Sequence, residues 1–149
     1  MSEVRFYHLT VSTAKDTLPK LLEKTLERER RALVKLPDED DVDFWNEYLW
    51  AYNAERFLPH GTIKEPGSDE HPIFLTHLDE NPNGADYLFL INGADRVDLG
   101  IFDMTALLFD GNDQNAVNSA RSKWMALREE SHQLTYWEQA NSGNWKKKT

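Results

Sequence analysis

Short apolar segments alternate with longer stretches of helical periodicity along this chain, and that alternation limits the fold more than any other feature. Residues 4–9 and 32–36 are rich in branched and aromatic side chains, which is typical of strands. Between these segments, Leu18, Leu22 and Leu26 recur at helical spacing. A strand, a helix and a strand in this order predict a β-α-β unit and therefore a parallel sheet.

The same alternation continues toward the C-terminus. Pro19 is expected in the opening turn of the first helix, where its missing N–H costs little. Asp38 is expected to cap a second helix that buries Val42, Trp45 and Leu49. Further strands are predicted at residues 72–78, 87–91 and 105–109, followed by a long helix over about 114–130.

The length of 149 residues fits one domain. We therefore predict a single-domain α/β fold with a mainly parallel sheet flanked by helices, of Rossmann-like topology. Residues 63–70 are polar and are predicted to be a mobile surface loop. Residues 141–149 are predicted to be a polar, basic C-terminal tail, and the role of Lys146, Lys147 and Lys148 in it is left open.

Composition excludes several classes of protein. The chain has no cysteine, so a disulfide scaffold, a thiolate zinc site and a cysteine nucleophile are excluded. The first residues do not resemble a signal peptide, and no apolar run approaches the length of a membrane span, so we expect a cytoplasmic protein. The formal charge of −9 should repel DNA, and we expect any work near DNA to proceed through protein partners.

The usual motifs of enzymes are missing from the sequence. Neither glycine-rich phosphate pattern occurs, and the G-x-S-x-G nucleophile elbow does not occur either. The acidic run at residues 38–41 is explained by the positive end of a helix dipole, and the five histidines show no paired spacing typical of a metal site. We therefore predict no catalytic residue, metal or cofactor; a small nucleotide-processing α/β enzyme remains the alternative.

Two groups of residues remain as candidate functional sites. Trp50, Phe57, Leu58 and Pro59 are large apolar residues at a point where a chain normally becomes polar, and they either cover the core or form the anchors of an interface. The second group, on the last predicted helix, is Arg121, Lys123, Trp124 and Arg128. This group is either a solvated basic face beside a core tryptophan or a small site for an acidic peptide.

These two groups, with the opening residues 6–9, lie in an order and at spacings that resemble the chi subunit of bacterial DNA polymerase III holoenzyme. The stretch A-E-x-F-x-P-H at residues 54–60 is the most distinctive part of the resemblance, which spans nearly the whole chain. It implies an α/β fold related to nucleotide-binding folds but without nucleotide chemistry. It also implies a subunit that links the clamp loader to the single-stranded-DNA-binding protein.

The resemblance also implies partners and residues. Trp50, Phe57, Leu58 and Pro59 would contact a small psi-type clamp-loader subunit. The last helix would bind the acidic, phenylalanine-ended C-terminal tail of the single-stranded-DNA-binding protein, with Arg121 on the tail's carboxylates and Trp124 beside its phenylalanine. Met125 stands where the family often has lysine, a loss of charge for which Lys123 or Arg128 would compensate. An adaptor that binds the same tail outside the replicase remains an alternative, and the existence of a psi partner and the oligomeric state are left open.

Overall fold

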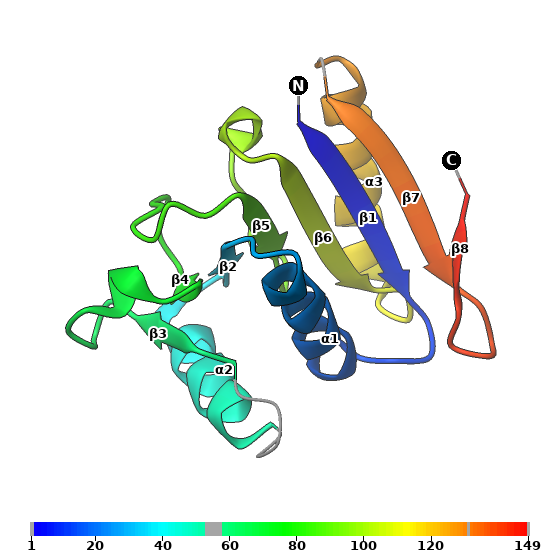
Figure 1. Cartoon of the computed structure of the whole chain (residues 1–149). Helices are drawn as coiled ribbons and strands as arrows, with labels where there is room; N and C mark the ends of the chain where they lie inside the picture. The colour runs from blue at the N-terminus through cyan, green and yellow to red at the C-terminus, as the bar shows by residue number, and fades with distance from the viewer. Residues whose placement is uncertain (1, 53–57, 131, 149) are drawn as a thin grey trace.

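The computed structural model describes residues 2–52, 58–130 and 132–148, and within them the chain forms one sheet, three α-helices and two short 3-10 helices (Figure 1). The strands are β1 (Glu3–Leu9), β2 (Ala32–Lys35), β3 (His60–Thr62), β4 (Ile73–Thr76), β5 (Tyr87–Leu90), β6 (Met104–Asp110), β7 (Gln133–Gln139) and β8 (Trp145–Lys147). The helices are α1 (Ala14–Glu27), α2 (Glu39–Ala51), α3 (Gln114–Arg128), η1 (Ser68–Glu70) and η2 (Leu99–Ile101).

The strands are joined in the order β3-β4-β2-β5-β6-β1-β7-β8. Neighbouring strands from β3 to β7 are parallel, and among the described strands only β8 runs antiparallel, against β7. The predicted α/β class with a mainly parallel sheet is confirmed. β1 and β2 both belong to this sheet, although β6 and β5 lie between them. Every residue of β4 is buried, as expected of a strand covered on both faces.

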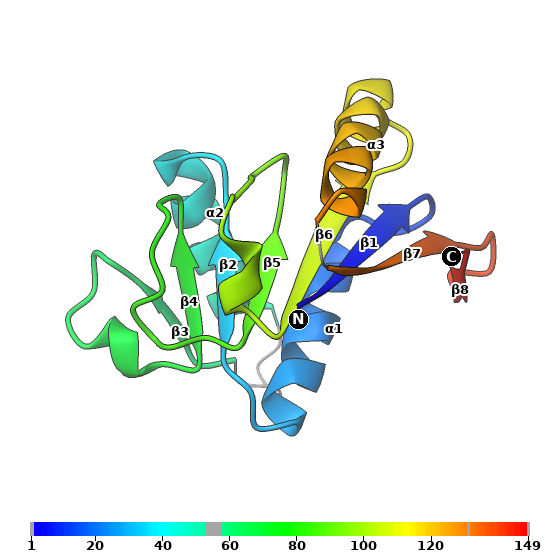
Figure 2. The same cartoon turned by 90° about the horizontal axis from the view of Figure 1, so that it is seen from above.

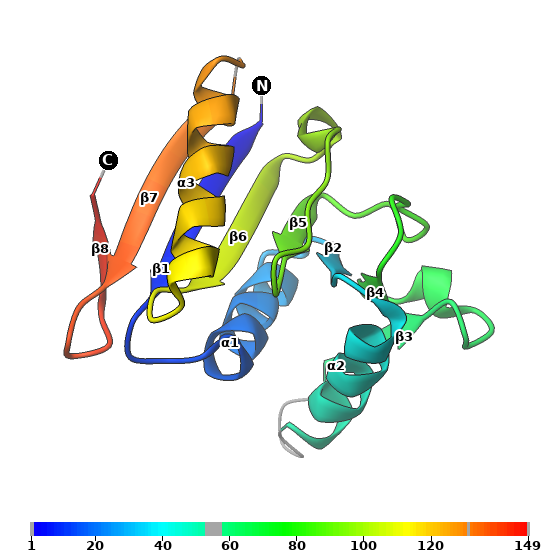
Figure 3. The ribbon, with the colours of Figure 1, turned by 180° about the vertical axis from the view of Figure 1, so that it is seen from behind.

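The helices cover both faces of the sheet, and Figures 2 and 3 show α1 and α3 on opposite sides of β1 and β6. α1 and α2 pack on one face, where Leu18 of α1 and Trp45 of α2 belong to the same buried cluster. α3 packs on the other face, over β6, β1 and β7, through Val117, Ala120 and Leu127. α2 and α3 therefore pack against different faces of the sheet.

α1 begins earlier than predicted, which changes the position of Pro19. The Thr13 N–H donates to the Asp16 carboxylate at 3.2 Å and caps the helix start. Pro19 lies inside the helix, so its expected place in the opening turn is wrong. A proline there leaves the carbonyl four residues earlier without its helical donor. Tyr48 of α2 donates its hydroxyl hydrogen to that carbonyl, on Lys15, at 2.9 Å, and so joins the two helices.

The start of α2 agrees with its prediction. The Asp38 side chain accepts a hydrogen bond from the Asp41 N–H at 2.9 Å, which is the geometry of an N-cap. The acidic residues that follow lie in the first turn, where the helix dipole favours negative charge. Val42, Trp45 and Leu49 are buried, as predicted.

The sheet extends beyond its predicted limits at both edges. β7 and β8 follow α3, and Trp145–Lys147 of the predicted tail forms β8. At the other edge, β3 is a strand of three residues. The predicted loop at 63–70 contains η1, and the Ser68 hydroxyl there contacts the carbonyl oxygens of Thr62 and Glu65.

Candidate partner-binding surfaces

α3 carries basic and apolar side chains together on one side. Arg121, Trp124, Met125 and Arg128 fall in one sector because each residue advances a helix by roughly 100°. Both arginines are exposed, and 66% of the Met125 surface is exposed. Neither guanidinium has an ion-pair partner among the described residues. We call these four residues the α3 patch.

The indole of Trp124 is fixed by two other rings. It is half-buried, and its edge meets Phe6 of β1 at 5.2 Å between ring centroids and Tyr136 of β7 at 5.8 Å. Phe6 and Tyr136 also stack on each other at 6.5 Å. Because one side of the indole packs on the sheet and part of it stays exposed, Trp124 is suited to form the wall of a shallow apolar site.

Tyr136 was not expected at this site, since no strand was predicted there. Its hydroxyl lies 2.6 Å from Nδ1 of His8. Burial raises the pKa of the Tyr136 phenol, the charge of Glu138 raises it further, and the charge of Arg121 acts in the opposite direction. Arg121 on α3 and Glu138 on β7 therefore both act on this phenol.

His8 is held in turn by the end of β6 and by the loop that follows it. Its ring lies 4.9 Å from the ring of Phe109. A Cβ atom at Gly111 would lie 2.2 Å from the His8 ring and 2.6 Å from the Leu9 carbonyl oxygen. Only glycine therefore fits at residue 111 without moving the histidine that contacts Tyr136.

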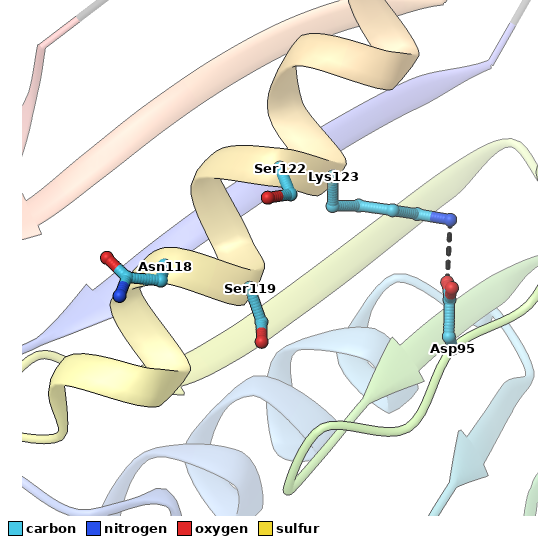
Figure 4. A pocket seen from close by; sticks show the side chains of 5 residues that line it. All are labelled: Asp95, Asn118, Ser119, Ser122 and Lys123. Carbon is cyan, nitrogen blue, oxygen red and sulfur yellow. Dashed lines mark ion pairs between the residues drawn. The ribbon is translucent and has the colours of Figure 1, made fainter.

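Lys123 does not belong to the α3 patch. It lies about 200° around the helix from Arg121, and its Nζ forms an ion pair with Asp95 at 2.6 Å (Figure 4). The ammonium also donates to the Arg96 carbonyl at 3.3 Å. Figure 4 shows Lys123 extending from α3 toward Asp95, with Ser119 and Ser122 lining the same shallow hollow. Asp95, distant in sequence, therefore already pairs with the charge of Lys123, and the predicted contact of Lys123 with a tail stays a prediction.

The second predicted surface lies at the end of α2. Trp50 is 47% exposed, and its ring lies 4.2 Å from the ring of His60, which is fully buried. Pro59 is half-buried. Leu58 is only 3% exposed and belongs to the core, so its side chain offers almost no surface for the predicted direct contact. Phe57 lies outside the described residues.

His60 is the residue that fixes this surface. Its Nδ1 lies 2.6 Å from the Leu58 carbonyl oxygen, and its Nε2 lies 3.0 Å from the carbonyl oxygen of Asn46 in α2. The ring therefore joins α2 to the chain entering β3 while it packs against Trp50. The sequence pattern placed His60 in a loop and offered no signal for this role.

The loop after β1 lies where many parallel sheets bind phosphate groups. Here Gln139 of β7, which is buried, places its side-chain oxygen 3.0 Å from the Val11 nitrogen and 2.9 Å from the Ser12 nitrogen. The Gln139 amide also donates to the Ser12 hydroxyl at 2.9 Å. The backbone donors of this loop are thus satisfied by a side chain of the protein itself.

Other chemistry finds little support in the described residues. Within 2–52, 58–130 and 132–148, no group of three or more metal-ligating side chains comes together. None of the helices in those ranges combines the length and the apolar character needed to span a bilayer.

Comparison with known proteins shows what the chain is similar to. The model of the family described as DNA polymerase III chi subunit, HolC, matches residues 1–135. A curated protein of Rickettsia prowazekii (strain Madrid E), described as probable DNA polymerase III subunit chi, is 27% identical over 95 residues. That alignment covers 64% of this chain and 58% of the relative, so the chain spans less than two thirds of the length of that relative. The family match includes α2 and α3 and ends within β7.

Proposed function

The chain belongs to the DNA polymerase III chi subunit family, and from this premise we propose that it is a non-catalytic adaptor in the replicative polymerase. It joins the clamp loader, through a psi-type subunit, to the acidic C-terminal tail of the single-stranded-DNA-binding protein. The observation that carries this proposal is the α3 patch, which combines exposed apolar surface with arginines that have no ion pair among the described residues, in a protein of formal charge −9. An acidic peptide matches that combination, whereas free DNA is repelled by the protein as a whole.

The tail-binding site in this proposal is the α3 patch. Arg121 holds tail carboxylates, because a guanidinium pairs with them in a fixed planar geometry. Trp124 and the exposed Met125 form the apolar surface for the terminal phenylalanine. Arg128 compensates for the lysine that the family often has in place of Met125. Lys123 does not, because Asp95 holds it on another side of the helix.

The psi-type contact in this proposal is centred on Trp50 and Pro59. An exposed tryptophan packed on a buried histidine is a rigid apolar anchor, and such residues dominate the energy of many interfaces. Trp50 belongs to α2, which packs on one face of the sheet, and the α3 patch belongs to the helix that packs on the other face. Two partners bound at these places do not compete for the same surface, which supports a bridging role.

A non-catalytic role is supported by the loop after β1. A nucleotide-processing enzyme of this class uses backbone N–H groups there for phosphate. In this protein Gln139 already accepts from Val11 and Ser12.

The proposal is tested by titrating the protein with a synthetic acidic peptide that ends in phenylalanine, at low and at high salt. We expect binding near micromolar, about −8 kcal/mol, that weakens as salt screens the charges. Arg121→Ala and Trp124→Ala are expected to abolish it. Lys123→Ala is the matched control, because it removes one positive charge from the same helix but from a different side, and it is expected to bind like the wild type. Absence of binding by the wild type at low salt refutes the tail-binding proposal, and equal losses in Arg121→Ala and Lys123→Ala refute the assignment of the site.

A further inference from the structure

β8 places two adjacent lysines on opposite faces of the sheet. Lys146 pairs directly with Glu138 of β7, and directly opposed residues of an antiparallel pair point to the same side. Glu138 and Tyr136 are two residues apart on β7, so they share that side, which is the side covered by α3. Trp145 points to the other side, where its ring meets Tyr7 at 5.2 Å. Lys147 is two residues from Trp145 and shares the far face with it.

The face that holds Lys146 also carries the α3 patch. Trp124 on α3 meets Tyr136 on β7, so the helix and the strand are in contact there. Lys146 is exposed and, like Arg121, has no ion-pair partner among the described residues. On this face, cationic side chains without an ion pair among the described residues therefore stand both on α3 and on β8.

The negative charge of Glu138 lies among the lysines at this edge of the sheet. Lys148, whose N–H donates to the Tyr136 carbonyl at 2.7 Å, pairs its ammonium with Glu138 at 3.4 Å. Glu138 also lies 4.0 Å from Nδ1 of His8. Because Lys148 is engaged with this carboxylate, Lys146 is the lysine of β8 that is free to bind a ligand on this face.

The spacing of the strands sets the distance that a bound peptide must span to reach Lys146. Lys146 lies one strand across and two residues along from Tyr136, a separation of roughly 8 Å between Cα atoms. An extended peptide covers that distance in about three residues, at roughly 3.3 Å per residue. A ligand whose last residue contacts Trp124, beside Tyr136, can therefore reach Lys146 with residues a few positions upstream.

We propose that the acidic tail lies across the face between α3 and β8, and that Lys146 binds one of the carboxylates upstream of its terminal phenylalanine. This inference rests on the proposed function and assigns it a second contact, on a strand beyond the residues of the family match. Two neighbouring lysines thereby have different roles: Lys146 binds the tail, and Lys147 does not.

The test compares Lys146→Ala with Lys147→Ala, which remove the same charge from neighbouring positions on opposite faces. Each is titrated with an acidic peptide ending in phenylalanine and with the same peptide carrying amides in place of its upstream carboxylates. At about 0.15 M salt charges further apart than roughly 8 Å are largely screened. Under these conditions we expect Lys146→Ala to weaken the acidic peptide about two- to fivefold, the range of an exposed ion pair, and to leave the amide peptide unchanged. Lys147→Ala is expected to bind both peptides like the wild type.

A third variant tests the sign of the effect. Glu138→Gln removes the opposing carboxylate from this face and is expected to tighten the acidic peptide by a similar factor. Equal binding by Lys146→Ala and Lys147→Ala, or an equal loss for both peptides, overturns the inference while the proposed function stands. Failure of the wild type to bind either peptide overturns the proposed function, and the inference with it.

Discussion

Replacing Gly111 by alanine is expected to destabilise the protein through His8. The added Cβ would lie 2.2 Å from the His8 ring and 2.6 Å from the Leu9 carbonyl oxygen, to which the Gly111 N–H donates. The histidine cannot retreat freely, because Phe109 packs on its ring and its Nδ1 is 2.6 Å from the Tyr136 hydroxyl. The substitution therefore moves both the ring and its hydrogen bond.

Three terms give the size of the effect. Overpacking of this kind costs about 1–3 kcal/mol, and the loss of the His8–Tyr136 hydrogen bond costs about 0.5–1.5 kcal/mol. Replacing glycine lowers the entropy of the unfolded chain, which returns about 0.4–1 kcal/mol. The sum is a loss of roughly 2 kcal/mol, which for a chain of this length lowers Tm by about 4–8 °C.

Urea and thermal denaturation followed by circular dichroism measure this loss, with Gly100→Ala as the matched control. Gly100 lies in η2, and a Cβ atom added there would have no neighbour within 4 Å. Only the unfolded-chain term then applies, so the stability of this control should stay equal or rise by up to about 1 kcal/mol. If Gly111→Ala is as stable as Gly100→Ala, His8 is not confined as described and the reasoning fails.

Two further predictions concern His60 and Tyr136. His60→Ala is expected to lower the free energy of unfolding by about 3 kcal/mol, since it removes a fully buried ring and its hydrogen bonding to backbone carbonyls. Urea denaturation measures this loss, and the control His77→Ala, at a partly exposed residue, should lose less than about 0.5 kcal/mol. Equal losses in the two variants would contradict the role of His60. The raised pKa of Tyr136 stabilises the fold fully below the unfolded value of about 10, and this contribution is lost as pH rises through the folded value. Denaturation of the wild type and Tyr136→Phe across alkaline pH should therefore show a steeper loss in the wild type, and parallel curves would refute the pKa assignment.

Periodicity predicted those parts of the fold whose residues are buried in a regular pattern. The apolar segments that became β2, β5 and β6, and the stripe of Val42, Trp45 and Leu49, are examples. β7 escaped prediction because only Thr135 and Gln139 of its residues are buried, and both are polar. β8 escaped because three residues at a sheet edge carry almost no periodic signal.

The candidate sites were predictable only where they depend on one element. The spacing of Arg121, Trp124 and Arg128 on α3 is a property of the helix itself, so the sequence contains it. The pairing of Lys123 with Asp95 depends on a loop from elsewhere in the chain. The burial of Leu58 likewise depends on packing against the core formed by distant strands. Tertiary contacts of this kind leave no local pattern.

The side chain of Gln139 occupies the backbone N–H groups of the loop after β1, in the place that a bound anion would take. Its oxygen accepts from the nitrogens of Val11 and Ser12 and lies 3.4 Å from that of Thr10, while its amide donates to the Gly143 carbonyl at 3.1 Å. A tethered group competes at an effective concentration of millimolar or more. An anion from solution must displace it before reaching the loop, so the tethered side chain weakens the binding of free phosphate groups at this end of the sheet.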